Sequence, residues 1–592
     1  MPDEQQRPTP LEQMERPEGL GNRKMGWGSD ALAETVRRLG FTYISLTPGA
    51  SYRGLHDSLI NYLGNVDPQM LLCIHEDAAV AVAHGYAKAT DRPMAVALHA
   101  NVGLMHAVMG VYNAWCDRVP MLVIGATGAI DAPKRRHWIE WIHTSKDQGG
   151  LIRQFTKWDD QPGSVQAAIE SLLRGSQITR TAPKGPVYVC LDVPLQEDEL
   201  AEEPRLPDVA RYKPAAAHPA PADTVAEAAD MLLAAKRPVM LLGRVSRSRA
   251  GWDARVRLAE TLGMRVVTSE LSAAAFPTTH PLHVDWPRPG LGEESRAALR
   301  EADVILSLDT NDLAGRLRTV WPDDKVTAKV IQVSVDSHAH GGWAMDYQGL
   351  PPVDCLILAE PEAAVPPLLA LAEAARGKAE PMDENARAHA LEAPATGPLT
   401  LSHVAAHFQR ATQGRKVCRT RVPFAWPGEA FQFTDPLDYL GRDGGGGVGS
   451  APGIGIGAAL ALREMKSDRL PVTLCGDGEF IMGMQSLWTA ARYSIPLLIV
   501  VGNNRSFFND EVHQEEMARQ RGRPVENKWI GMRMDGPAID LAGIARDQGI
   551  EAIGPVTSNE DLPAALARGI AAVDSGRPFV IDCVVPPTYK VK

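Results

Sequence analysis

The chain has 592 residues, too many for one hydrophobic core, and about three or four domains fit this length. Its hydrophobic content of 45% and charged content of 22% are ordinary for a globular protein. The net charge of −11 argues against a protein that binds nucleic acid non-specifically, because such binding needs a basic surface.

The cysteines and the N-terminus indicate the compartment. The seven cysteines show no CxxC spacing, and several stand inside apolar, strand-like runs. We therefore expect buried thiols in a reducing environment rather than disulfides or a zinc site. The sequence has no run of about 18 apolar residues and no apolar signal region at its start. These features predict a cytoplasmic protein that does not enter a membrane.

Residues 1–27 are polar, which predicts an exposed and partly disordered arm. After the arm, apolar strand-like runs alternate with helix-like segments, as in parallel sheets with crossover helices. Two polar stretches divide this pattern into units of similar size. We expect an α/β protein with three doubly wound parallel-sheet domains at 28–195, 223–375 and 398–592, joined by linkers at 196–222 and 376–397.

The most specific pattern is GDGEFIMGMQSLWTAARYSIPLLIVVGNNRS, residues 476–506. One predicted strand, PVTLCGD, ends at Asp477, and the next, PLLIVVGNN, ends at Asn504. The carboxyl ends of neighbouring parallel strands meet at one sheet edge, so we expect both side chains there, where ligands bind. A carboxylate, an amide oxygen and a backbone carbonyl suit Mg²⁺ together with phosphate and water. The alternative, a glycine turn and an unrelated Asn cap, explains GDG alone.

This segment resembles the diphosphate-binding motif of thiamine diphosphate (ThDP) enzymes, and within them the group of benzoylformate decarboxylase and acetolactate synthase. The resemblance implies ThDP and Mg²⁺ as cofactors. Asp477 and Asn504 would bind the metal through their side chains, and Ser506 through its carbonyl. The residues that would shape the turn around the diphosphate are Gly476, Gly478 and Glu479.

Two further motifs match the same family. In MLLCIHEDAAVAVAHGYAKAT, residues 70–90, a strand would end at Glu76, which would protonate N1′ of the cofactor and favour its imino form. In GGGGVGSAPGIGIGAAL, residues 444–460, Val448 would prop the cofactor in its bent shape, although the family more often has a larger residue there. The Gly446 carbonyl would accept a hydrogen bond from the N4′ amino group. Each motif alone is also compatible with an ordinary helix start or glycine loop.

The resemblance covers nearly the whole chain after the arm and implies a pyrimidine-binding, a central and a diphosphate-binding domain. In this family the acid at N1′ comes from a partner subunit, so we expect a homodimer or a dimer of dimers. The central segment LLGRVSRSRAG, residues 241–251, could hold an adenine nucleotide, as in some relatives. We nevertheless expect no FAD or ADP in this domain.

The first two candidate pocket loops are TPGASYRGL, residues 47–55, and LHANVGLMHAV, residues 98–108. In the second loop, His99 aligns with a pocket histidine of benzoylformate decarboxylase and could move protons at the bound intermediate. The other candidate lining residues of the two loops are Ala50, Ser51, Tyr52 and Asn101.

Beyond the asparagines, Asp510 and His513 would face a polar substrate, or would cap the helix that follows. The central domain has DTNDL, residues 309–313, where the decarboxylase carries a second catalytic histidine. His280 and His283 are nearby candidates that the resemblance does not align.

The expected function is a ThDP- and Mg²⁺-dependent cleavage and formation of C–C bonds, most simply by a 2-oxo acid decarboxylase and carboligase acting on a 2-oxo acid or an acyloin. The alternatives within the superfamily are a C–C hydrolase, a 2-hydroxyacyl-CoA lyase and an acetolactate synthase-like transferase. A non-catalytic regulatory subunit that binds ThDP or a nucleotide is the alternative from another class. The presence of Glu76 together with Asp477 and Asn504 disfavours it.

Overall fold

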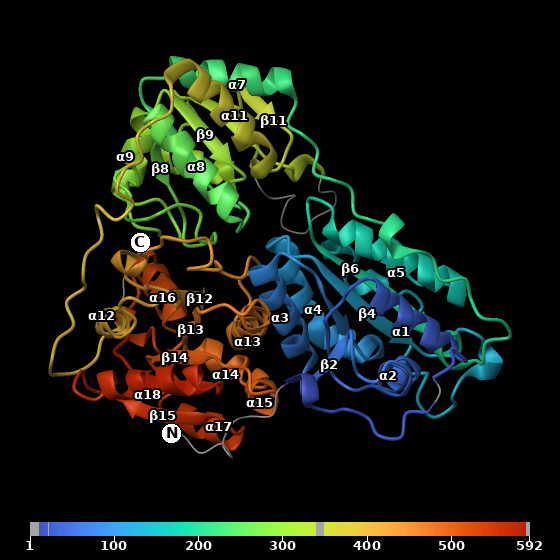
Figure 1. Ribbon diagram of the computed structural model, residues 1–592. Coiled ribbons are helices and arrows are strands. Elements are labelled where there is room, and N and C mark those ends of the chain that lie inside the picture. The colour runs from blue at the N-terminus through green and yellow to red at the C-terminus, as the bar shows by residue number, and fades with distance from the viewer. Residues whose placement is uncertain (1–10, 22, 339–348, 588–592) are drawn as a thin grey trace.

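Three domains, each built on a parallel β-sheet with helices on its faces, form the protein (Figure 1). The structure is a computed structural model and describes residues 11–21, 23–338 and 349–587. Within these residues, neighbouring strands in all three sheets pair in parallel. The expected α/β class with three doubly wound sheets is confirmed.

The first domain contains a six-stranded sheet in the order β2-β1-β3-β4-β6-β5. Its strands are β1 (Tyr43–Leu46), β2 (Gln69–Leu72), β3 (Met94–Ala97), β4 (Met121–Thr127), β5 (Trp158–Asp160) and β6 (Pro186–Asp192). Its helices are α1 (Gly28–Arg38), α2 (Arg53–Asp57), α3 (Glu76–Thr90), α4 (Ala100–Cys116), α5 (Val165–Arg180) and α6 (Val193–Glu197). Consecutive residues of β1, β3 and β4 enter different hydrophobic clusters on the two faces of the sheet, which explains their unbroken apolar sequences.

The central domain contains a five-stranded sheet in the order β11-β10-β9-β7-β8. Its strands are β7 (Pro238–Leu242), β8 (Arg265–Val267), β9 (Val304–Leu308), β10 (Lys329–Val333) and β11 (Cys355–Ile357). Its helices are α7 (Ala222–Ala234), α8 (Arg249–Leu262), α9 (Glu293–Glu301), α10 (Leu313–Val320) and α11 (Pro361–Arg376).

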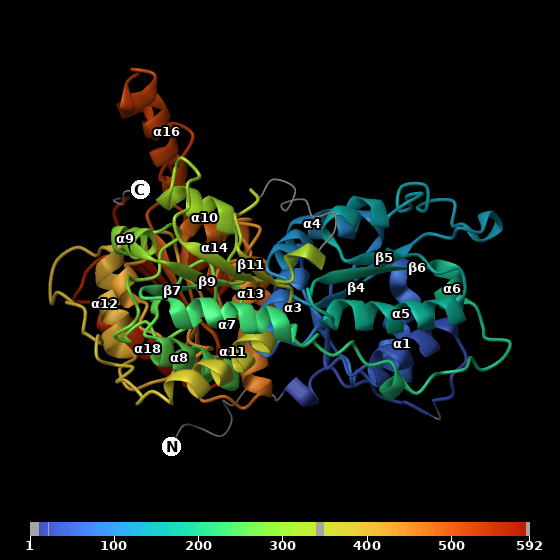
Figure 2. The same ribbon diagram turned by 90° about the horizontal axis from the view of Figure 1, so that it is seen from above.

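The third domain contains a five-stranded sheet in the order β12-β13-β14-β16-β15. Its strands are β12 (Val417–Arg421), β13 (Leu470–Gly476), β14 (Leu498–Asn503), β15 (Glu551–Val556) and β16 (Phe579–Val584). Its helices are α12 (Leu401–Ala411), α13 (Ala451–Glu464), α14 (Asp477–Met482), α15 (Ser486–Arg492), α16 (Phe508–Gln520), α17 (Leu541–Asp547) and α18 (Leu562–Asp574). Helix α16 projects from the body of this domain (Figure 2).

The expected linkers fall between α6 and α7 and between α11 and α12, where the chain contains no strand. The described part of the arm packs on the body of the protein. Leu11 is buried, and Glu15 forms an ion pair of 2.7 Å with Arg492 of the third domain. Residues 1–10 of the expected disordered arm lie outside the described residues.

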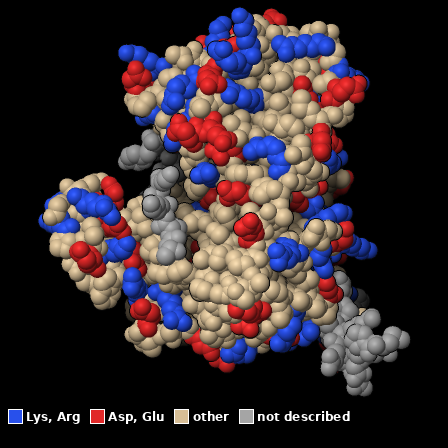
Figure 3. All heavy atoms as spheres, turned by 90° about the vertical axis from the view of Figure 1, so that its left-hand side faces the viewer, with Lys and Arg blue, Asp and Glu red and all other residues tan. Residues whose placement is uncertain are grey.

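All seven cysteines lie in the described ranges; none forms a disulfide, and six are buried. Among the described residues, no helix combines the length and apolar character needed to span a membrane. On the face shown in Figure 3, basic and acidic side chains are interspersed over the central and third domains.

Helices α3 and α13 join the first and third domains and lie side by side (Figures 1 and 2). Small residues let their backbones approach closely. A Cβ added at Gly85 would lie 1.9 Å from the Ile454 carbonyl oxygen, and one at Gly457 would lie 1.8 Å from the Val82 carbonyl oxygen. Any side chain at these two glycines would therefore push the helices apart.

Gly85→Ala is expected to lower the free energy of unfolding by about 3 kcal/mol, the upper end of the usual cost of overpacking, because both contacts at this helix crossing are with rigid backbone. Denaturant unfolding of the full chain measures this loss. Gly163→Ala is the control, since a Cβ at this exposed glycine meets no atom within 4 Å. Equal stability of the two variants would contradict the close packing of α3 on α13.

Candidate active site

A cavity of about 230 Å³ opens at the carboxyl ends of β13 and β14. The two strands pair in parallel with Gly476 level with Gly502, which brings Asp477 and Asn504 to the same edge of the sheet. Both residues line the cavity together with Ser506 and Val448. The structure thus brings together residues from the GDG, NN and glycine-loop motifs. The sequence-predicted lining residues are Val448, Gly476, Asp477, Gly478, Glu479, Asn504, Ser506 and Asp510.

Asp477 is the first residue of α14 and is only 3% exposed. Its Oδ1 accepts a hydrogen bond of 2.9 Å from the Gly478 N–H, and its Oδ2 accepts one of 3.2 Å from the Ser506 N–H. Burial raises the pKa of this carboxyl to about 6, although the backbone N–H groups oppose the shift. A nearby cation would favour the ionised form, which is the form that binds metals.

The two asparagines have different positions. Asn503 is buried, and its Nδ2 donates to Asp582 Oδ1 at 2.9 Å. Asn504 lines the cavity, and its Oδ1 accepts a hydrogen bond of 3.0 Å from the Ser506 N–H. These bonds fix the turn after β14, so that the oxygen atoms of Asp477, Asn504 and the Ser506 backbone could serve as ligands of a hard divalent cation.

The glycine loop before α13 is tied to this edge by Glu479. Its Oε1 accepts hydrogen bonds of 3.2 Å from the Gly449 N–H and 2.9 Å from the Ala451 N–H. Gly446 has a φ of +66°, a value that favours glycine, and Val448 is 45% exposed toward the cavity. The role of Glu479 in the structure is therefore to hold two motifs together.

Glu76 lies on the first domain, as the first residue of α3 rather than at the end of a strand, because β2 ends at Leu72. Glu76 as a whole residue is 8% exposed, and its Oε2 lies 3.0 Å from Nδ1 of His106 on α4. Gly103 lies directly beside it, since an added Cβ there would be 3.1 Å from Glu76 Oε1. Glu76, at the start of α3, is thus held in place by contacts with α4.

His99 caps the N-terminus of α4 and is hydrogen-bonded to Ser51, with 2.8 Å between Nδ1 and Oγ. Ser51 Oγ accepts from the Ala100 N–H at 3.0 Å, so its own proton can go to His99 Nδ1. This assignment leaves a proton on His99 Nε2. Burial lowers the pKa of His99, which favours the neutral imidazole. His143 packs edge-on against the His99 ring, with 4.8 Å between ring centres.

The remaining predicted pocket residues are dispersed. Tyr52 is 1% exposed and its hydroxyl donates to the Thr47 carbonyl, so its side chain belongs to the domain core. Ala50 is exposed, and Asn101 donates from Nδ2 to the Ile142 carbonyl at 3.1 Å. Asp510 is exposed and lines the third-domain cavity.

Three histidine positions lie away from the cavity described above. His513 is exposed on the projecting helix α16 (Figure 2). His280 and His283 are buried in the central domain. Burial lowers the pKa of His283 to about 3, which keeps this imidazole neutral.

Glu76 and the third-domain cavity are separate in a single chain. The cavity lining contains no residue from the first domain among those described. Gly103 of α4 contacts Glu76, whereas Met109 contacts Gly447 of the glycine loop. These two points on α4 are about 9 Å apart along the helix axis. Within one chain, Glu76 therefore does not line this cavity.

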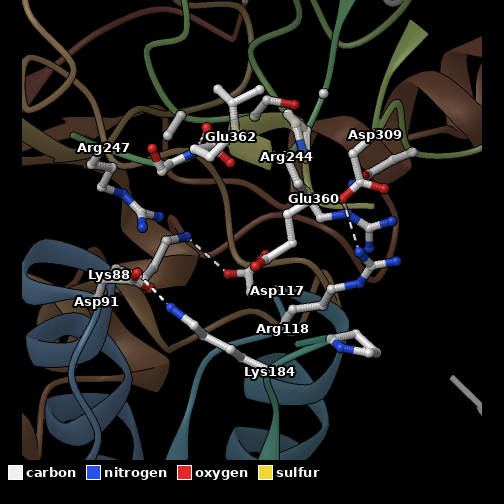
Figure 4. Close-up of a pocket in the computed structure, with 18 of the residues that line it drawn as sticks. Lys88, Asp91, Asp117, Arg118, Lys184, Arg244, Arg247, Asp309, Glu360 and Glu362 are labelled. Carbon is white, nitrogen blue, oxygen red and sulfur yellow. Dashed lines mark hydrogen bonds and ion pairs between the residues drawn. The ribbon is translucent and has the colours of Figure 1, made fainter. Parts of the chain in front are cut away.

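A second, charged cavity of about 140 Å³ lies between the first and central domains (Figure 4). Most of its charges pair with each other. Asp309, from DTNDL, lies 2.8 Å from Arg118, and Lys184 lies 2.5 Å from Asp91. Arg244 and Arg247, from the central segment considered for a nucleotide, also line it. The expected absence of FAD or ADP stays a prediction.

One buried cluster links this cavity to the glycine loop. The Lys88 ammonium lies 2.8 Å from Asp117 and donates to the Arg442 carbonyl at 2.6 Å (Figure 4 shows the first contact). Burial alone would raise the pKa of Asp117, but Lys88 and His84 lower it far below its usual range. A Cβ at Gly444 would meet Asp117 Oδ1 at 2.6 Å, so the loop starts against this carboxylate.

Three residues of the candidate site, His106, Arg421 and Glu511, are not predicted from the sequence. His106 stands seven residues after His99 on α4, so helical spacing could have placed both on one face. Arg421 lines the third-domain cavity, and Glu511 is fully buried and accepts from Ser506 Oγ at 2.5 Å. No local motif marks these two positions.

Asn504→Ala is expected to weaken Mg²⁺-dependent ThDP binding by more than about tenfold, the loss typical even of outer-sphere partners of a metal. Titration calorimetry at several Mg²⁺ concentrations measures the effect. The adjacent Asn503→Ala should instead lower the free energy of unfolding by about 1–3 kcal/mol, because it leaves Asp582 without its partner, and should retain most of the affinity. The reverse pattern would contradict this assignment.

Comparison with known proteins agrees with the geometry. Three models of the thiamine pyrophosphate enzyme family match in chain order: the N-terminal TPP binding domain at residues 26–149, the central domain at 225–348 and the C-terminal TPP binding domain at 424–583.

Individual relatives align over almost the full chain. A benzoylformate decarboxylase of Pseudomonas aeruginosa is 27% identical, over 93% of this chain and 97% of its own length. An acetolactate synthase large subunit of Corynebacterium glutamicum is 25% identical, over 98% of this chain and 90% of its own. The crystal structure of benzoylformate decarboxylase from Polynucleobacter necessarius has the same fold, with a TM-score of 0.78 at 18% identity, covering 96% of this chain and 100% of that one. Since the three family models together match more than half of its residues, the chain belongs to the thiamine pyrophosphate enzyme family.

Proposed function

We propose that the protein is a ThDP- and Mg²⁺-dependent enzyme that cleaves the bond next to the carbonyl of a 2-oxo acid, releases CO₂ and joins the remaining acyl unit to a proton or an aldehyde. The observation that carries this proposal is the cavity in which Asp477, Asn504 and Val448 meet at one sheet edge. The benzoylformate decarboxylase relative supports the choice of a 2-oxo acid as substrate.

The residues of the third-domain cavity fit a metal-bound diphosphate. The available ligands are oxygen atoms, which Mg²⁺ prefers. A Cβ added at Gly476 or Gly446 would have no atom within 4 Å, so the backbone at both positions is open to a ligand. Asp477, Asn504 and the Ser506 carbonyl would hold the metal, and Val448 would support the organic part of the cofactor.

Thiamine diphosphate, when bound, supplies the electron sink that C–C cleavage next to a carbonyl requires. The chain supplies positioning and proton transfer. Glu76 would exchange a proton with the pyrimidine N1′, because it is a buried carboxylate held by α4. His99 would deliver a proton to the substrate from Nε2, since Ser51 occupies Nδ1.

A second copy of the chain completes the proposed site. Glu76 does not line the cavity that contains Asp477 in the same chain. Two chains related by a two-fold axis would each place Glu76 over the cavity of the other, so that one symmetric contact creates two sites. This supports a homodimer, alone or paired into a tetramer. We also propose a cytoplasmic location, which the seven free thiols support because thiols persist in a reducing compartment.

The direct test loads the purified protein with ThDP and Mg²⁺ and screens 2-oxo acids, with and without aldehydes, by product NMR. Release of CO₂ from a 2-oxo acid is the expected result. Turnover of acyloins or acyl-CoA substrates alone would reject the decarboxylase in favour of a lyase or hydrolase.

Mixing two inactive variants tests the shared site. Glu76→Gln and Asp477→Asn should each lower turnover by about 100-fold or more, because each removes one half of a site. After reversible dissociation and random reassociation, half of the dimers contain one intact site, so activity should recover to about a quarter of wild type. If the mixture stays inactive while hybrid dimers form, the site lies within one chain.

Ser51→Ala is expected to lower kcat about tenfold with a smaller change in KM, because His99 loses the bond that fixes its tautomer. Steady-state kinetics with the substrate from the screen measure both constants. Ser58→Ala is the control, since this buried serine bonds Asp30 at 2.7 Å and not the histidine. A loss confined to KM, or equal in both variants, would contradict a role in proton transfer.

A further inference from the structure

Two histidines flank Glu76 on the first domain. His75 precedes it and caps α3, and His106 approaches from α4. The imidazole nitrogens and the carboxylate oxygen that these three residues can offer all lie within 4.8 Å of one another. The two imidazole rings stack with centres 5.0 Å apart and planes inclined by 18°. We propose that His75, Glu76 and His106 form a binding site for a transition-metal ion such as Zn²⁺, separate from the magnesium site of the third domain.

The packing of α3 on α4 leaves this site open to an ion. Gly103, one turn before His106, has no side chain to separate α4 from the Glu76 carboxylate. His106 is 59% exposed at its side chain, whereas that of Glu76 is 11% exposed. In the single chain, an ion arriving from solvent would therefore meet the histidine first and then the shielded carboxylate.

The type of ligand distinguishes the two metal sites. Two imidazole nitrogens and one carboxylate are a typical zinc ligand set, which leaves a fourth position for water. The third-domain cavity offers only oxygen ligands at its metal residues, which suits Mg²⁺. Mg²⁺ is therefore not expected to compete for the histidine site at ordinary concentrations.

Both histidines can coordinate in the neutral form. The Asp77 N–H donates to His75 Nδ1 at 3.2 Å, and His106 Nδ1 lies 3.0 Å from Glu76 Oε2. Coordination through His75 Nε2 moves its proton to Nδ1 and breaks the long capping bond. Coordination through His106 Nδ1 moves its proton to Nε2 of the same ring, whose side chain is largely exposed. Neither change releases a proton from the protein.

The consequence rests on the proposed function of Glu76. A carboxylate bound to a metal cannot hold the proton that Glu76 would exchange with N1′. Zn²⁺ at this site should therefore inhibit turnover, and excess chelator should restore it.

Titration of the cofactor-free full-length protein with Zn²⁺ alone, in competition with a chromogenic chelator, tests the site without any enzyme assay. Wild type should bind one ion per chain at this site, and His75→Asn and His106→Asn should each weaken binding more than tenfold. His218→Asn, in an exposed linker, is the control and should bind as wild type. Circular dichroism of the metal-free variants checks that they are folded. Unchanged Zn²⁺ binding in folded His75→Asn and His106→Asn would overturn the proposal.

A measurement of enzyme activity in the presence of Zn²⁺ distinguishes failure of this inference from failure of the proposed function. Zn²⁺ should inhibit wild type at concentrations that leave the residual activity of His106→Asn unaffected. If no substrate is turned over, the titration alone still decides whether the metal site exists. If the enzyme is active and the histidine variants bind Zn²⁺ as wild type does, the metal site fails and the proposed function stands.

Discussion

The close contact between α3 and α13 determines how the two cofactor-binding domains sit together. Gly85 and Gly457 let each helix touch a backbone carbonyl of the other, which no residue with a side chain permits without movement. Helix α3 begins at Glu76, and α13 begins just after the glycine loop that carries Val448. The positions of the acid and of the loop are therefore both set by one helix crossing.

The two halves of the proposed site differ in their chemistry. At the edge of the third sheet, Asp477 and Asn504 are fixed by backbone N–H groups and present oxygen atoms to the cavity. On the first domain, Glu76 and His99 are held by side chains, His106 and Ser51. One half is suited to bind a metal and phosphate, and the other to move protons. Neither half alone supports the proposed reaction.

Much of this arrangement could be predicted from the sequence, because local patterns carry it. Asp477 and Asn504 follow apolar strands, and parallel pairing of those strands brings them together. Local patterns do not predict the direction of a side chain. The loop position of Tyr52 indicates a pocket, whereas its side chain is buried in the domain core. His106, Arg421 and Glu511 depend on which helix or strand packs against which, and that information is not local. The turn from β2 into α3 also moves Glu76 from a strand end to a helix start.

The contacts of Lys88 give helix α3 a second structural role, at the end opposite to Glu76. Its first residue, Glu76, is the proposed acid of one active site. Near its last turn, Lys88 forms an ion pair with Asp117 and donates a hydrogen bond to the Arg442 carbonyl, beside the glycine loop of the other active site. In the proposed dimer, α3 therefore contributes to both active sites: Glu76 at its start belongs to one, and Lys88 near its end contacts residues beside the other. A displacement of α3 at one centre would therefore also move the Lys88 contacts with Asp117 and the Arg442 carbonyl at the other.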